Sequence, residues 1–393
     1  MVAEAPAKQR LSERVRAVPP SGIRKFFDVI ATMPDVISLG VGEPDFTTPD
    51  QIVEEGVRSL RAGRTHYTSN YGTIELRRAL SAHLERLYGV TYDPADEICV
   101  TVGASEAVAA TMAALVDPGD EVVLHEPSYV DYLPSIMFNG GVPVFVSTTA
   151  ATNFALTPEA VEAAIRPRTK VLFLGYPCNP TGAVLDEATL RAIADIARKH
   201  DLLVVSDEIY DRLVYGGHRH IPISSLPGMR ERTVLMGGFS KAYAMTGWRV
   251  GYVCAPRDLL EGIVKVHQYE IMSAPTTAQD AAVVALATAE ADVHRMTGEY
   301  DRRRRMFVDG LNALGLPTVE PLGAFYAFPS IKPTGLTSEQ FSERLLFEHK
   351  VAVIPGSAFG PSGEGHVRAT LATSYEDLQQ ALTRIKAFVS SLG

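Results

Sequence analysis

Seven short apolar runs alternate with helical patterns through the middle of the chain, and this alternation is the strongest constraint on its fold. The runs lie at residues 98–103, 121–127, 143–147, 171–177, 202–208, 233–240 and 249–256. Most are continuously apolar, which is typical of strands buried on both faces. Helical patterns separate several of them, at residues 105–116, 158–165 and 187–200. This order predicts an α/β fold, a three-layer and mostly parallel sheet covered by helices.

The character of the sequence changes after about residue 288. DRRRRMFVDGLNALG (301–315) is typical of an amphipathic helix, and residues 323–331 and 366–373 are typical of strands. These elements predict a second, smaller α+β unit. The arginine run 302–305 is expected to form a solvated helix face rather than a phosphate site.

The length of 393 residues is enough for about two to three domains. We expect an N-terminal arm with part of a small domain at 1–47, a large domain at 48–288, and a small C-terminal domain at 289–393.

Charge and hydropathy narrow the function classes. The net charge of −9 argues against nucleic acid or an anionic membrane surface as partners. We find no apolar run of the ~18 residues that span a bilayer and no apolar segment typical of a secretory signal. Cys99, Cys178 and Cys254 give no even-numbered disulfide framework. We therefore expect a soluble cytoplasmic protein with buried free thiols and no metal site.

Polar side chains follow several of the predicted strands. In open α/β sheets, ligands bind outside the carboxyl ends of the strands. Ala104 and Ser105 open a helix there, which favours an anion site, although Ser105 can equally be an ordinary N-cap. The other residues at strand ends are Tyr129, Asn179, Asp207, Tyr210 and Lys241. Taken singly they have structural explanations: the asparagine as a turn residue, the aspartate as a cap and a tyrosine as a core ring. Together they favour a phosphorylated aromatic aldehyde as the ligand.

Lys241 stands in the stretch GGFSKAYAMTGWRVGY (237–252), with Arg249 in the same stretch. Neither cation has an acidic neighbour within this stretch. Burying an ammonium group without a partner is costly, so a lysine here needs a chemical reason.

From about residue 21 to its C-terminus, the chain resembles the class I aminotransferases, pyridoxal-phosphate enzymes of fold type I. The resemblance rests on SKAYAMTGWRVGY (240–252) together with NPTG (179–182) and SDEIY (206–210). NPTG alone would be a weak signal, but the combination is highly specific.

This resemblance implies a role for each residue that binds pyridoxal 5′-phosphate. Lys241 corresponds to the lysine whose amine condenses with the cofactor's aldehyde and later acts as general base. Asp207 corresponds to the partner of the pyridine nitrogen, which keeps the ring an electron sink. Tyr210 and Asn179 correspond to donors to the phenolic oxygen, and Tyr129 to the ring stacked on the pyridine. The phosphate would be held by Ser240, Arg249 and the amides of Ala104 and Ser105.

Three further segments resemble parts of the family that contact the substrate or a second subunit. In HYTSNYG (66–72), Tyr67 corresponds to the tyrosine that reaches the neighbouring subunit's phosphate, which implies a homodimer with shared active sites; a surface-loop tyrosine is the other reading. In GEGHVRATLA (363–372), Arg368 corresponds to the arginine that grips the substrate's α-carboxylate. In SLGVGEPDF (38–46), Gly40 corresponds to a backbone contact of the same carboxylate, which Asn179 also helps to bind. The G-x-G of this segment lacks the third glycine and the helix that a dinucleotide fingerprint requires.

The resemblance implies transfer of an amino group from an L-amino acid, such as aspartate or an aromatic one, to a 2-keto acid such as 2-oxoglutarate. The two half-reactions at one site predict ping-pong kinetics. A C–S β-lyase of the same fold would share every residue named. A non-catalytic regulator would need a DNA-binding domain, for which the first ~20 residues are too short.

Two details of the site can also be expected. The segment IMSAPTTAQ (271–279) has no basic residue, so an acidic substrate would need another cation, for example Lys25. The resemblance places tight turns at Glu126–Pro127 and Asn179–Pro180, so both bonds are predicted to be cis.

Overall fold

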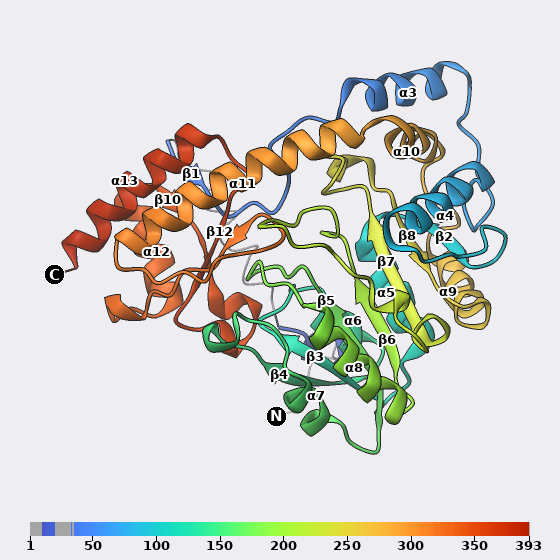
Figure 1. The fold of residues 1–393 in the computed structure, drawn as a ribbon, viewed down its shortest axis with the longest axis horizontal. Coiled ribbons are helices and arrows are strands. Elements are labelled where there is room, and N and C mark those ends of the chain that lie inside the picture. The colour runs from blue at the N-terminus through green and yellow to red at the C-terminus, as the bar shows by residue number, and fades with distance from the viewer. Residues whose placement is uncertain (1–9, 20–32, 34, 393) are drawn as a thin grey trace, which may run out of the picture.

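The computed structural model describes residues 10–19, 33 and 35–392, and in this part of the chain all seven apolar runs contain strands (Figure 1). The strands are β2 (Ile98–Thr101), β3 (Glu121–Glu126), β4 (Val142–Ser147), β5 (Thr169–Gly175), β6 (Leu203–Asp207), β7 (Thr233–Gly238) and β8 (Gly251–Cys254). They form one sheet in the order β2-β8-β7-β6-β5-β3-β4. β8 is antiparallel to both of its neighbours, and the other pairs are parallel. The predicted α/β fold with a mostly parallel sheet is confirmed.

Helices cover both faces of this sheet because successive strand residues point to opposite sides. Leu172 packs on the face covered by α7 (Pro158–Ala164) and α8 (Glu187–Lys199). Phe173 packs on the other face, covered by α5 (Gly103–Leu115), α6 (Tyr132–Phe138) and α9 (Arg257–Glu270). Of the further helices, α4 (Ile74–Tyr88) lies beside β2, α10 (Thr276–Thr288) packs against α4, and α3 (Asp50–Arg61) packs against α10. The result is the predicted three-layer arrangement.

A smaller unit contains residues from both ends of the chain. β1 (Ile37–Ser38) pairs in parallel with β10 (Val351–Ala352). β11 (Ile354–Pro355), β12 (Val367–Thr370) and β9 (Tyr326–Ala327) form an antiparallel sheet. Around them lie α11 (Glu290–Ala313), α12 (Ser338–His349) and α13 (Tyr375–Ser391), and α11 runs from beside α10 to the small unit (Figure 1). The division at residues 47 and 288 stays a prediction, and the short helix α1 (Glu13–Ala17) lies in the predicted arm.

The arginine run differs from its predicted role as a solvated helix face. The run lies on α11, as expected, and Arg302 and Arg305 have half or more of their side-chain surface exposed. Arg303 and Arg304 are buried, at 6% and 3% exposed. Arg304 pairs with Asp301 and Glu320, and Arg303 with Glu299 and Asp45. The prediction is therefore wrong for two of the four arginines, because acidic partners satisfy their charge inside the fold.

Two local predictions are confirmed. Cys99, Cys178 and Cys254 are buried free thiols. The Glu126–Pro127 and Asn179–Pro180 bonds are cis, and so is Tyr176–Pro177, which was not predicted. Among the described residues, no helix is both long and apolar enough to cross a bilayer.

Candidate active site

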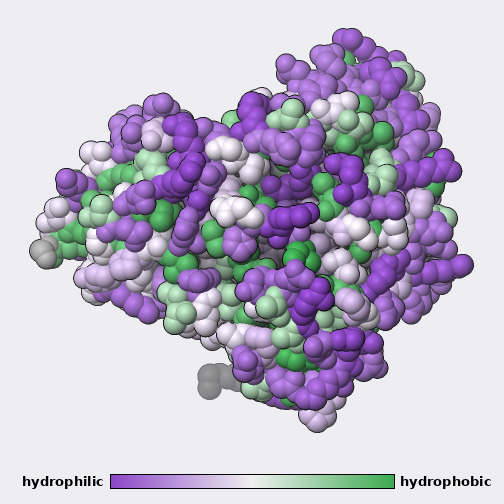
Figure 2. All heavy atoms as spheres, in the orientation of Figure 1, coloured by the Kyte–Doolittle hydropathy of each residue, from purple (hydrophilic) through white to green (hydrophobic). Residues whose placement is uncertain are grey.

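A cavity of about 550 Å³ lies where the carboxyl ends of the sheet strands face the small unit. In the space-filling view, hydrophilic residues dominate the periphery, while hydrophobic residues gather toward the middle of this face (Figure 2). The cavity brings together most of the residues predicted for the site, namely Ala104, Ser105, Tyr129, Asn179, Asp207, Tyr210, Ser240, Lys241, Arg249 and Arg368. They come from six separate regions of the sequence, so the fold assembles the site that the motifs predicted.

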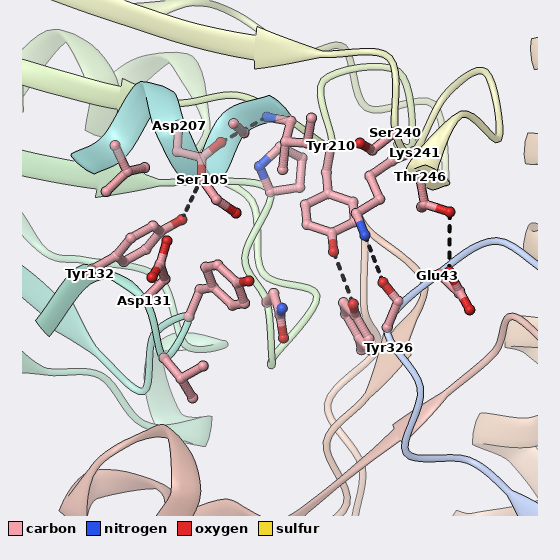
Figure 3. Close-up of a pocket in the computed structure, with 18 of the residues that line it drawn as sticks. Glu43, Ser105, Asp131, Tyr132, Asp207, Tyr210, Ser240, Lys241, Thr246 and Tyr326 are labelled. Atoms are coloured by element: carbon pink, nitrogen blue, oxygen red, sulfur yellow. Dashed lines mark hydrogen bonds between the residues drawn. The ribbon is translucent and has the colours of Figure 1, made fainter. Parts of the chain in front are cut away.

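Lys241 lies on the loop that follows β7 and points into the cavity (Figure 3). Its Nζ donates to the carbonyl oxygen of Gly42 at 2.6 Å. Burial lowers the pKa of Lys241 to about 8, and the positive charges of Arg368 and Arg249 act in the same direction. An amine with this pKa is neutral far more often near pH 7 than an ordinary lysine, and the neutral amine is the nucleophilic form.

Asp207 is the last residue of β6, and its side chain lines the cavity (Figure 3). The hydroxyl of Tyr132 donates to its Oδ2 at 2.9 Å, and the backbone N–H of Ile209 donates to its Oδ1 at 3.1 Å. Burial raises the pKa of Asp207 to about 6, although both hydrogen bonds favour the carboxylate and oppose this rise. These two hydrogen bonds thus hold the carboxyl group in one orientation.

The N-terminal turn of α5 and Arg249 form a positive corner of the cavity. Ala104 and Ser105 lie in the first turn of the helix, where backbone N–H groups have no partner inside the helix. Arg249 donates to the carbonyls of Thr246 at 3.0 Å and Val102 at 3.4 Å, and no described carboxylate pairs with it. Helix dipole and guanidinium together make this corner suitable for an anion such as phosphate.

Arg368 supplies a second positive group, deep in the cavity wall formed by the small unit. It is 2% exposed, and its Nη1 and Nη2 donate to Asn179 Oδ1 at 3.0 Å and to the carbonyl of Gly40 at 2.6 Å. Its Nε has no hydrogen-bond partner among the described residues. Burial lowers the pKa of Arg368 from its ordinary value. A buried guanidinium without a carboxylate partner is suited to bind one from a ligand.

Comparison with known proteins decides the family. The profile of the family described as aminotransferase class I and II matches residues 34–385. The chain belongs to this family. It is therefore an aminotransferase, an enzyme that transfers amino groups.

Relatives of this aminotransferase are similar along nearly their whole length. A putative aminotransferase of Bacillus subtilis, YugH, is 50% identical, with 96% of this chain and 98% of that protein covered. An aspartate aminotransferase of Pyrococcus abyssi is 47% identical over 96% of this chain and 97% of its own. The crystal structure of an aromatic aminotransferase from Pyrococcus horikoshii superposes with a TM-score of 0.90 at 44% identity, covering 94% and 99% of the two chains.

Several residues that line the aminotransferase's cavity were not predicted from its sequence. Tyr132 holds Asp207, and Tyr326 forms a 2.9 Å hydrogen bond between its hydroxyl and that of Tyr210 (Figure 3). Asp131 and Glu43 also line the cavity, and burial raises the pKa of Asp131. The spacing of Tyr132 from Tyr129, one turn of a helix, could have indicated the first; the others had no local signal.

Three of the residues named from the sequence need separate mention. Tyr67 does not line the cavity and is 80% exposed, so its expected role toward a second subunit stays a prediction. Gly40 lies behind the cavity wall, where its carbonyl accepts the hydrogen bond from Arg368. Lys25 lies outside the described residues.

Proposed function

We propose that this aminotransferase uses pyridoxal 5′-phosphate to move the amino group of an L-amino acid to a 2-keto acid. The observation that carries the proposal is one cavity with three chemically different ends. A lysine amine of lowered pKa, an oriented carboxylate and an anion-binding corner are all present. These match the aldehyde, the ring nitrogen and the phosphate of the cofactor in kind.

The residues present fit this group in detail. Arg249, Ser240 and the first turn of α5 would hold the phosphate, and Tyr129 would lie against the ring. Asp207 would contact the ring nitrogen, and Tyr210 with Asn179 the phenolic oxygen. Close packing around this corner supports the fit, since a Cβ on Gly103 would lie 2.6 Å from Nη2 of Arg249. When bound, the cofactor supplies an electrophilic carbon and a ring that withdraws electrons from the substrate's α-carbon.

The protein's own residues then have distinct tasks. Arg368 binds the substrate's α-carboxylate through its planar donors and thereby orients the α-carbon. Asn179 is already hydrogen-bonded to Arg368, so it fixes the guanidinium plane. Nζ of Lys241, in its neutral form, removes the proton from the substrate's α-carbon. The same amine returns this proton in the next step of the amino-group transfer. Because amino acid and keto acid use the same groups in turn, the reaction follows a ping-pong scheme.

The substrates proposed are aspartate or an aromatic amino acid as donor and 2-oxoglutarate as acceptor. The names of the similar enzymes from Pyrococcus support both donor classes. We also propose a cytoplasmic homodimer in which Tyr67 of one subunit contributes to the other subunit's site; its exposure leaves it accessible for this role.

Replacement of Lys241 tests the proposal. Lys241→Ala should lower turnover to less than about a thousandth of wild type, because both nucleophile and base are lost. The variant should still bind pyridoxal 5′-phosphate, since the anion corner is intact. Lys265→Ala, on the exposed side of α9, is the control and should retain activity. Release of ammonia and pyruvate from cystathionine without any keto acid would show lyase chemistry instead.

A further inference from the structure

We propose that Arg303 is a positioning residue that sets the affinity for the substrate's α-carboxylate. It would act by holding residues 39–48, called the strap here, against the cavity. The inference rests on the proposed function, because it assigns Arg368 to the substrate's carboxylate. It also gives a role to an arginine run that the sequence predicted to be merely solvated.

The strap touches the two most important cations of the site. The carbonyl of Gly40 accepts from Nη2 of Arg368, and the carbonyl of Gly42 accepts from Nζ of Lys241, both at 2.6 Å. The carboxylate of Glu43 accepts from Oγ1 of Thr246, which follows Lys241 on the same loop, at 3.1 Å (Figure 3). A shift of the strap would therefore move the hydrogen-bond acceptors that orient both cations.

Arg303 holds the strap from the side opposite the cavity. Its Nη1 donates to both carboxylate oxygens of Asp45, at 2.9 Å each, and its Nε donates to Glu299 at 2.9 Å. The same Nη1 lies 3.4 Å from the carbonyl oxygen of Leu371, directly after β12. Because β12 carries Arg368, Arg303 contacts both the strap and the strand whose relative positions define the carboxylate site.

Aromatic packing strengthens the same attachment. The ring of Phe46, next to Asp45, meets the ring of Tyr300 edge to face, with 5.4 Å between centroids. The guanidinium carbon of Arg303 lies 5.3 Å from the centre of the Phe46 ring. The side chain of Arg303 is 7% exposed and that of Asp45 is 26% exposed, so their ion pair is partly shielded from water. Without the charge of Asp45, Arg303 keeps Glu299 as an anionic partner, but the strap loses its ion pair to α11.

Backbone hydrogen bonds and side chains fix the two ends of the strap. The carbonyl of Leu39 accepts from the N–H of Thr370 at 2.8 Å, and the hydroxyl of Thr48 donates to the carbonyl of Ala244 at 2.6 Å. Between these ends, Asp45 is where the strap is tied to α11. Loss of that tie should leave the strap attached but displaced, which predicts weaker substrate binding rather than unfolding.

The arginine run offers matched controls. Arg305 pairs with Asp301 at 3.2 Å and is 64% exposed. Arg302 pairs with Glu299 and lies over the ring of Tyr375 at 3.8 Å. These contacts of Arg302 and Arg305 lie away from the strap, yet both residues share the helix and the charge of Arg303. Arg305→Gln therefore removes a similar charge without touching the strap.

The experiment measures kcat and KM for the amino acid and the keto acid in the cofactor-loaded dimer. Asp45→Asn keeps the side chain's volume, and Arg303→Lys keeps the charge but loses the fork of donors. Because loss or misalignment of hydrogen bonds to a charged group weakens binding, we expect KM for both substrates to rise about 10- to 100-fold. We expect kcat to change less than about threefold, with Arg305→Gln unchanged. In the double variant, KM should rise no more than in the single variant with the larger effect.

Two outcomes would overturn the inference. One is an unchanged KM in both variants. The other is a fall in kcat at constant KM, which signals lost active protein and a merely structural role. Melting temperatures measured alongside identify folding defects, and if Arg303→Lys does not fold, Asp45→Asn alone decides.

Binding of an unreactive carboxylate separates this inference from the proposed function. Calorimetric titration with 3-phenylpropionate and succinate reports on Arg368 without any turnover. If the wild type binds them but transfers no amino group, the proposed function fails while the comparison of variants still tests the strap. If the variants bind them as tightly as wild type, the strap has no role in the carboxylate site.

Discussion

At the scale of single residues, burial pushes Lys241 and Asp207 toward their uncharged forms from opposite directions. The pKa of the lysine falls to about 8 and that of the aspartate rises to about 6. Both groups can therefore gain or lose a proton close to neutral pH, as groups in active sites commonly do. Each shift leads to a measurable consequence.

The reactivity of Lys241 should level off near pH 8 in the cofactor-free protein. Only the neutral amine reacts with an acylating reagent, so labelling should rise with pH through about 8 and then plateau. In the unfolded chain it should continue to rise through the ordinary pKa of 10.5. Competitive acetylation across a pH series, read by mass spectrometry on the peptide containing Lys241, measures both curves. Coinciding midpoints would show that the fold does not perturb this amine.

Asp207 should cost the cofactor-free protein stability at neutral pH. Its folded-state pKa of about 6 lies above the ordinary 3.8, so stability falls as pH rises from about 4 to 6. Asp207→Asn should therefore stabilise the cofactor-free protein at pH 7 to 8 by about 1–2 kcal/mol, with little gain at pH 4. Urea unfolding at both pH values measures this, and turnover should fall at the same time. Equal gains at both pH values would contradict the assigned cause.

The sequence predicted the residues that belong to contiguous motifs and missed those that only the fold brings close. Lys241, Asp207 and Asn179 each stand in a short segment with a specific pattern. Tyr326 reaches the site because β9 pairs with β12, where Tyr326 faces Thr370. The prediction that Arg303 is solvated is wrong because its partner Asp45 lies 258 positions away in the sequence. Pairings between distant segments leave no mark on local periodicity, so no pattern of the chain alone could reveal them.

At the scale of elements, the anion corner depends on how closely β8 approaches α5. A Cβ on Gly251, the first residue of β8, would lie 2.7 Å from the backbone carbon of Gly103 and 2.9 Å from the backbone nitrogen of Ala104. Backbone atoms cannot move aside cheaply. The sequence predicted both elements, but not that β8 runs antiparallel between β7 and β2, which is what creates this approach.

Gly251→Ala should therefore weaken cofactor binding strongly. The added methyl group forces the first turn of α5 away from Arg249, so we expect affinity for pyridoxal 5′-phosphate to fall about tenfold or more. Fluorescence titration of the cofactor-free protein measures it.

Gly262→Ala is the matched control for that variant. Gly262 lies in the middle of α9, away from both ends of the helix. A Cβ added there would contact only Ala114, at 3.9 Å. Because alanine favours helices over glycine, it should stabilise the protein by about 0.5–1 kcal/mol and leave cofactor affinity unchanged. Equal cofactor affinity in both variants would show that the close approach is not needed.

At the scale of the whole molecule, the site lies between the large sheet and the small unit, and we propose that a second subunit completes it. Tyr67 is 80% exposed and outside the cavity of its own chain. If its hydroxyl reaches the phosphate held by the other subunit, cofactor binding and dimerisation are linked, and each stabilises the other.

Removal of pyridoxal 5′-phosphate should weaken the dimer, and Tyr67→Phe should loosen the cofactor. Because one hydrogen bond to a charged group is lost, Tyr67→Phe should weaken the free energy of cofactor binding by about 1.5–3 kcal/mol. Analytical ultracentrifugation of cofactor-loaded and cofactor-free protein at falling concentration tests the linkage. Thr68→Ala, next to Tyr67, is a control for the loop itself. A fully active monomer would refute the shared site.

The sheet order also limits when the cofactor site can exist during synthesis. Thr101, the last residue of β2, pairs with Gly251 of β8, so the turn that opens α5 gains its neighbour only after the ribosome has delivered residue 254. Arg368 emerges later still. A nascent chain therefore carries β2 and α5 with an edge of β2 unpaired while residues 116–250 are synthesised, exposed to other chains and to chaperones. Since this pairing spans so much sequence, its closure is a slow, late event, and the cofactor can act only on the nearly finished polypeptide.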